Sequence, residues 1–74
     1  MEAHYRHFEI EPVTYAMKNR LGFAEGNVVK YVTRYKHKGG LQDLHKAKRY
    51  IDLLILNYEQ AEQENPGTDA HAKP

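Results

Sequence analysis

The chain has 74 residues, of which 41% are hydrophobic and 28% are charged, and its formal net charge is +1. A chain of this length forms one small domain, whose core rarely contributes more than about 3–5 kcal/mol of stability. The absence of cysteine excludes disulfides, thiolate zinc sites and cysteine nucleophiles. Self-association is the remaining source of stability that such domains commonly use, so we expect a homo-oligomer.

The sequence does not indicate a membrane protein or a secreted protein. It has no apolar run of the roughly 18 residues that a transmembrane helix needs. Its first residues, Met-Glu-Ala-His-Tyr, lack the basic and apolar regions of a signal peptide. We therefore expect a cytoplasmic protein without a membrane partner.

The small net charge conceals an uneven distribution of charge along the chain. Residues 27–50 carry seven Lys and Arg side chains against one Asp, whereas residues 51–74 carry five acidic side chains against one Lys. Residues 1–26 carry four acidic and three basic side chains. A basic middle segment between two acidic ends predicts an anionic ligand at the middle.

The first part of the chain is predicted to form an arm and a short helix. Residues 1–10 contain bulky side chains without a clean period, which indicates an ordered, extended arm that packs on the rest. Pro12 suits the first position of a helix, where its missing N–H has no partner to lose. Apolar residues then keep helical spacing as far as Leu21, and we expect Gly22 to end this helix.

A helical hairpin is predicted for the next part. Apolar residues from Val28 to Tyr35 recur at helical spacing, which indicates a helix over residues 24–36. The Gly39-Gly40 pair interrupts this pattern. The strongest periodic signal of the chain follows and predicts a third helix over residues 41–62.

These elements together predict an all-α fold with an N-terminal arm, a short helix and an antiparallel helical hairpin. They form one domain over residues 1–62, followed by a polar, disordered tail over residues 63–74. The third helix carries a second apolar strip, made of Tyr50, Leu53 and Leu56, beside its main apolar face. We expect this strip to contact another subunit or a partner protein.

Basic residues lie on both sides of the Gly39-Gly40 turn. If the hairpin is antiparallel, the basic residues of its two helices converge there, namely Lys30, Arg34, Lys36, Lys38, Lys46 and Arg49. Arginine offers a planar fork to a phosphate and lysine offers a point charge, so the leading interpretation is a phosphate-binding cluster. A solvated charged face and a contact with a nucleic-acid backbone are the alternatives.

Several residues near the cluster have two readings. Asp43 is either a cap that returns to the N–H of Gly40 or, in a catalytic site, a ligand of Mg²⁺. Asn27 is either a helix cap or a hydrogen-bond partner for a base. Tyr31 and Tyr50 either pack in the core or stack on a base. The sequence has no P-loop and no catalytic set that residue spacing alone would assemble.

Four segments resemble a small family, encoded mainly by tailed phages, that is catalogued as a domain of unknown function. They are His4-Tyr5, Ile10–Pro12, Gly26–Tyr35 and Lys38–Tyr50. A similar domain occurs in a larger phage deoxynucleoside monophosphate kinase that lacks a P-loop. The resemblance covers most of the chain and implies a phage protein that acts on nucleotides in the host cytoplasm.

The resemblance also implies roles for particular residues. It assigns ligand contacts to His4, Tyr5, Asn27, Lys30, Tyr31, Arg34, Asp43 and Lys46. In a kinase, the three basic residues of this set would neutralise phosphoryl charge and Asp43 would hold Mg²⁺. Because this chain is little more than the small domain, nucleotide binding is better supported than catalysis.

Two other functions fit the sequence. The protein could inhibit or redirect a host protein through the apolar strip of the third helix. It could instead bind the backbone of a nucleic acid, in which case its affinity would fall steeply with salt and grow with strand length.

Overall fold

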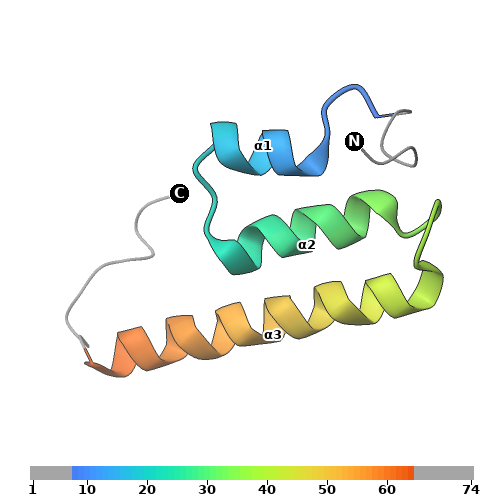
Figure 1. The fold of residues 1–74 in the computed structure, drawn as a ribbon. Coiled ribbons are helices and arrows are strands. Elements are labelled where there is room, and N and C mark those ends of the chain that lie inside the picture. The colour runs from blue at the N-terminus through green and yellow to red at the C-terminus, as the bar shows by residue number, and fades with distance from the viewer. Residues whose placement is uncertain (1–7, 65–74) are drawn as a thin grey trace.

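The computed structural model describes residues 8–64 and shows three helices there, α1 (Pro12–Lys18), α2 (Phe23–Arg34) and α3 (Gly40–Glu64), and no strand. α2 is the middle element, with α1 along one side and α3 antiparallel along the other (Figure 1). The prediction of an all-α fold with an antiparallel hairpin is confirmed. Most of the predicted arm and tail lies outside the described residues, and α3 continues two residues beyond its predicted end.

The end of α1 differs from its prediction. α1 stops at Lys18, and Arg20 follows with a positive φ of 58°. The Arg20 N–H donates to the carbonyl of Met17 at 3.1 Å, and the Leu21 N–H donates to the carbonyl of Ala16 at 2.9 Å. This pair of bonds is a Schellman ending with arginine at the position that glycine usually occupies. The expectation that Gly22 ends α1 is therefore wrong, since Gly22 is the N-cap of α2.

The connection between α2 and α3 is a short run of turns over residues 35–39, so α2 ends at Arg34 and not at the predicted residue 36. The Arg34 carbonyl accepts hydrogen bonds from the N–H groups of His37 and Lys38, at 2.8 and 3.0 Å. Gly40 has a φ of +55°, a conformation that glycine adopts without a steric penalty. These contacts reverse the chain and set α3 beside α2.

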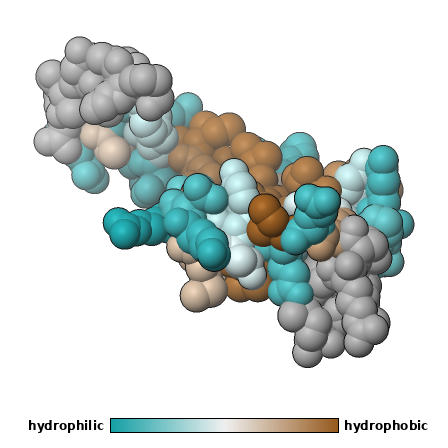
Figure 2. All heavy atoms as spheres, turned by 90° about the horizontal axis from the view of Figure 1, so that it is seen from above, coloured by the Kyte–Doolittle hydropathy of each residue, from teal (hydrophilic) through white to brown (hydrophobic). Residues whose placement is uncertain are grey.

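The interior of the described part is small. Among residues 8–64, the buried residues are Pro12, Asp43 and Ala47. Large apolar side chains on every helix are exposed, including Met17 at 73% and Phe23 at 79%. Figure 2 shows hydrophobic residues reaching the surface over much of the middle of the molecule. Three helices in one layer leave an open face on each side, because no second layer covers their apolar stripes.

α3 is about twice as long as its neighbour. Its 25 residues extend roughly 37 Å, whereas the 12 residues of α2 extend roughly 18 Å. Figure 1 shows α3 running on past the beginning of α2. The apolar residues in this second half, such as Ile55, Leu56 and Tyr58, are 47–51% exposed. Among residues 8–64, no helix combines the length and the apolar character that crossing a bilayer requires.

Candidate functional site

The Tyr31 ring lies at the centre of a group of three cations. The Lys30 Nζ lies 5.2 Å from the ring centroid, the Arg34 Cζ 5.1 Å and the Lys46 Nζ 5.3 Å. All three distances are within the roughly 6 Å range of a cation–π contact. Lys30 and Arg34 neighbour Tyr31 on α2, and the antiparallel hairpin brings Lys46 to it from α3. The structure thus brings together four of the predicted ligand residues, Tyr31 and the three cations around it.

Two further aromatic rings extend this group along the hairpin. Tyr50 of α3 stacks on Tyr31, with centroids 6.2 Å apart and an interplanar angle of 16°. Phe23, the first residue of α2, meets Tyr50 edge-on at 6.0 Å. We call the surface formed by Phe23, Lys30, Tyr31, Lys46 and Tyr50 the basic–aromatic face. Tyr50, which the sequence pattern groups with Leu53 and Leu56, thus contacts α2 through Tyr31.

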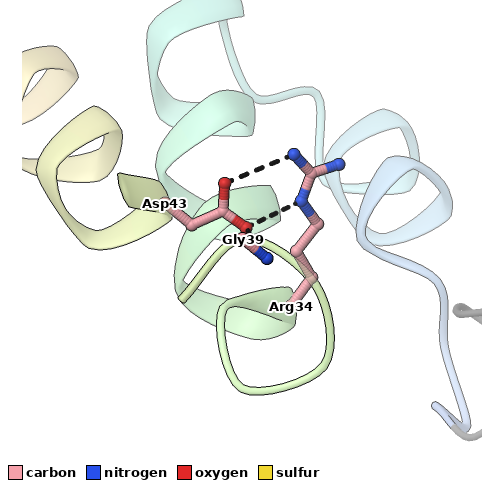
Figure 3. Close-up of polar contacts among 3 residues, drawn as sticks. All are labelled: Arg34, Gly39 and Asp43. Carbon is pink, nitrogen blue, oxygen red and sulfur yellow. Dashed lines mark hydrogen bonds and ion pairs between the residues drawn. The ribbon is translucent and has the colours of Figure 1, made fainter. Parts of the chain in front are cut away.

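Beside this face, Arg34 and Asp43 form an ion pair that closes the hairpin (Figure 3). The Arg34 Nε donates to Asp43 Oδ2 at 2.9 Å, and Nη2 donates to Oδ1 at 3.3 Å. The backbone N–H of Gly39 also donates to Oδ2, at 3.1 Å. The exposed fraction of the side chain is 11% for Arg34 and 1% for Asp43.

These contacts lower the pKa of the Asp43 carboxyl below its ordinary value of 3.8. The hydrogen bond from Arg34 is the largest cause, and burial of the carboxyl opposes it. The charge of Arg34, the Gly39 N–H and the charge of Lys46 lower the pKa further. Asp43 is therefore ionised, and its negative charge is paired with the Arg34 guanidinium.

The geometry does not fit Asp43 as a Mg²⁺ ligand or as a catalytic carboxylate. Both of its oxygens accept hydrogen bonds from Arg34, and almost none of the side chain is exposed. Mg²⁺ needs carboxylate oxygens that are free to coordinate at close range. Within residues 8–64, no three acidic or histidine side chains gather as a metal site requires. Asp43 acts as the helix cap, although its backbone partner is Gly39 and not the predicted Gly40.

The charges of Lys30 and Lys46 are not neutralised in the same way. Neither of these two ammonium groups forms an ion pair with another residue of the 8–64 range, whereas Arg34 pairs with Asp43 and Lys48 with Asp52. Lys30 is half-buried and Lys46 is exposed. Two ammonium groups without an ion-pair partner in this range therefore lie near the same aromatic ring, and the charge of Lys46 also acts on Asp43.

A cleft of about 430 Å³ lies between α1 and α2. Lys30 lines this cleft and also contacts the Tyr31 ring, so the cleft adjoins the basic–aromatic face. Its other walls are largely apolar and include Val13, Met17 and Phe23. Asn27 lines it too, and its Nδ2 donates to the Phe23 carbonyl at 2.9 Å. Asn27 is thus not a helix cap. Clefts of this size and character commonly hold small organic ligands.

The sequence did not indicate the apolar walls of this cleft. Residues such as Val13 and Met17 follow the same helical spacing as core residues, so the sequence pattern gives no sign that they are exposed. Lys38, predicted to join the cluster, lies in the turn, and no described contact links its side chain to Tyr31. His4 and Tyr5, two further predicted ligands, lie outside the described residues.

The sequence matches the family described as a protein of unknown function (DUF3310) over residues 2–52. The match covers more than half of the chain, and the protein belongs to this family. It includes α1, α2 and the part of α3 that carries Lys46 and Tyr50. No curated protein and no solved structure matches the chain. The resemblance seen in the sequence is thus confirmed as membership of a domain family of unknown function.

Proposed function

We propose that the protein binds a nucleotide, with the phosphate on the basic–aromatic face and the base in the cleft between α1 and α2. The observation that carries this proposal is the convergence of Lys30 and Lys46 on the Tyr31 ring, each without an ion-pair partner over residues 8–64. The two ammonium groups lie 5.2 and 5.3 Å from the same ring centroid, and their like charges repel each other. An anion between them removes this repulsion and gains charge-assisted hydrogen bonds.

The cleft favours a nucleotide over a simple phosphate. Its apolar walls suit a flat, largely apolar group, and the Asn27 side-chain oxygen is available to accept a hydrogen bond from a base. Lys30 connects the cleft to the cation pair, so one ligand can occupy both.

The resemblance noted in the sequence supports the same ligand class. It implies a phage protein that works in the host cytoplasm, in deoxynucleotide metabolism, and a relation to a P-loop-lacking deoxynucleoside monophosphate kinase. Our proposal is binding, since both oxygens of Asp43, the carboxylate that a kinase would use to hold Mg²⁺, accept hydrogen bonds from Arg34. Mg²⁺ would reach this site only as part of a bound nucleotide.

Calorimetric titration of the full chain with deoxynucleoside mono-, di- and triphosphates, with and without Mg²⁺, tests the proposal. We expect Lys30→Gln and Lys46→Gln each to weaken binding about tenfold or more, because a hydrogen bond to a charged group contributes about 1.5–3 kcal/mol. Arg49→Gln is the matched control, since it removes one positive charge from an exposed residue of α3 that makes none of the three cation–π contacts with Tyr31.

Phe23→Ala separates the base from the phosphate. It should weaken nucleotide binding but leave inorganic phosphate binding unchanged, because Phe23 lines the cleft and carries no charge. The proposal fails if no nucleotide binds, or if Arg49→Gln weakens binding as much as Lys46→Gln does. Affinity that grows with oligonucleotide length and falls steeply with salt would favour a nucleic-acid ligand instead.

A further inference from the structure

The hairpin has a second face, on the side away from Lys30 and Lys46, that is apolar. We define this apolar face by six residues, Val28 and Val32 of α2 and Leu44, Ile51, Ile55 and Tyr58 of α3. Val28 is half-buried and the other five are 38–51% exposed. So many large apolar side chains on one face mark an interaction surface more often than a solvated one.

The helical geometry of α3 groups four of these residues in one stripe. At about 100° per residue, the four α3 members of the apolar face fall within one narrow sector of the helix. Asp43, Ala47 and Leu54, which pack toward α2, occupy the neighbouring sector, and Lys46 lies beyond them on the opposite flank. The apolar stripe and the basic–aromatic face therefore lie on different sides of the hairpin.

α2 continues the apolar face across the hairpin. Because α2 runs antiparallel to α3, Val28 and Val32 lie on the flank that adjoins the α3 stripe, while Lys30 lies on the other flank. These two valines also line a second cleft of about 410 Å³ between α1 and α2, together with Ile10 and Tyr15. The apolar face thus reaches from α3 across α2 to the base of α1.

We propose that a second copy of this chain covers the apolar face, with the two α3 helices antiparallel around a two-fold axis. The charge pattern of α3 supports this partner. The first half of the helix carries Lys46, Lys48 and Arg49 against Asp43 alone, and the second half carries Asp52, Glu59, Glu62 and Glu64 without a basic residue. An antiparallel copy places each acidic half opposite a basic half, whereas a parallel copy opposes like charges.

The burial of the described residues supports the same arrangement. One layer of three helices buries Pro12 and Ala47 as its apolar residues, and residues 8–64 hold no metal cluster and no cysteine. A second hairpin packed on the apolar face makes a two-layer helical bundle, in which each stripe faces another. An isologous contact of this kind closes at the dimer.

This dimer is independent of the proposed function and compatible with it. Lys30, Tyr31 and Lys46 remain open to solvent, because they lie on the other side of the hairpin. The interface also differs from the strip predicted from the sequence, because Leu53 and Leu56 point away from the apolar face by helical phase. A dimer through the apolar face should be sensitive to substitution of Ile55, whereas a contact through the predicted strip should be sensitive to substitution of Leu56.

Sedimentation velocity of the full chain tests the interface with a closely matched pair of variants. Ile55 and Leu56 are both 51% exposed and are adjacent on α3, but only Ile55 belongs to the apolar face. We expect the parent chain and Leu56→Asp to sediment at twice the 8.6 kDa chain mass. Ile55→Asp should raise the dissociation constant by about 100-fold. A monomeric parent chain, or dissociation by Leu56→Asp alone, overturns the proposal.

Charge reversal tests the antiparallel direction without disturbing the apolar residues. Lys48→Glu and Glu59→Lys should each weaken the dimer about tenfold at low salt, and the double variant should restore it. These two residues are roughly 16 Å apart along one helix, so they do not interact within a chain. Restoration therefore requires that Lys48 of one copy faces Glu59 of the other. A double variant no tighter than the single variants contradicts the antiparallel arrangement.

Discussion

The two ends of α3 are held by different kinds of interaction. At the end nearest the turn, Asp43 is 1% exposed, and its carboxylate joins Arg34 of α2 to the Gly39 N–H. At the other end, Ile55 and Tyr58 are about half-exposed, and α2 does not extend far enough to cover them. The chain thus fixes one end of its hairpin by a few directional polar contacts, whereas large apolar side chains stay exposed at the other end.

The largest effect should come from removing the buried carboxylate. Asp43→Ala leaves the Arg34 guanidinium without its partner and should cost about 3 kcal/mol, most of the stability of a domain this small. Thermal unfolding followed by circular dichroism measures the loss.

Asp52→Ala is the control for this loss, because it removes a carboxylate from the same helix in an exposed pair with Lys48 at 3.6 Å. It should change the unfolding free energy by at most about 0.5 kcal/mol. If Asp43→Ala and Asp52→Ala lowered the unfolding free energy equally, the buried ion pair would not be what holds this end of α3.

A side chain at the turn should have the next largest effect. A Cβ at Gly39 would overlap the Asp43 carboxylate, which Arg34 holds in place. Gly39→Ala should therefore destabilise the protein by about 2 kcal/mol, as other overpacking substitutions do.

Gly40→Ala separates this overlap from backbone strain. A Cβ there meets nothing within 4 Å, but the φ of +55° is unfavourable for alanine and should cost about 1 kcal/mol. Chemical denaturation of both variants gives the comparison. A Gly39→Ala protein as stable as the parent would show that the carboxylate is free to move away.

The smallest expected effect is a dependence on acid pH. Because the pKa of Asp43 is lower in the folded protein than its ordinary 3.8, the unfolded chain binds the proton more readily. The pair with Arg34 therefore contributes full stability above that ordinary pKa, and the contribution is lost as the pH falls through the lowered, folded pKa. Asp43→Asn should be less stable than the parent near neutral pH and should lose less stability on acidification. Denaturant midpoints at pH 2 to 6 measure this, and parallel curves for the two proteins would contradict it.

Much of the candidate site follows from the sequence. The sequence predicts that Lys30 and Tyr31 lie on one helix, and the Gly39-Gly40 break predicts the reversal that brings Lys46 to Tyr31. The apolar cleft does not follow from the sequence, because Met17 and Phe23 fit a helical stripe whether it is covered or open. The opposite charges of Arg34 and Asp43 are visible in the sequence, but their pairing is not.

The sequence by itself determined the three helices, their order and the antiparallel hairpin, because periodicity and glycine act over neighbouring residues. The packing of the helices settled which charges pair, because Arg34 holds both oxygens of Asp43 whereas Lys30 and Lys46 form no ion pair within residues 8–64. It also settled that Tyr50 stacks on Tyr31 of α2, whereas Ile55 is 51% exposed. Helical spacing states which residues share a face, and the packing of one helix on another determines whether that face is covered.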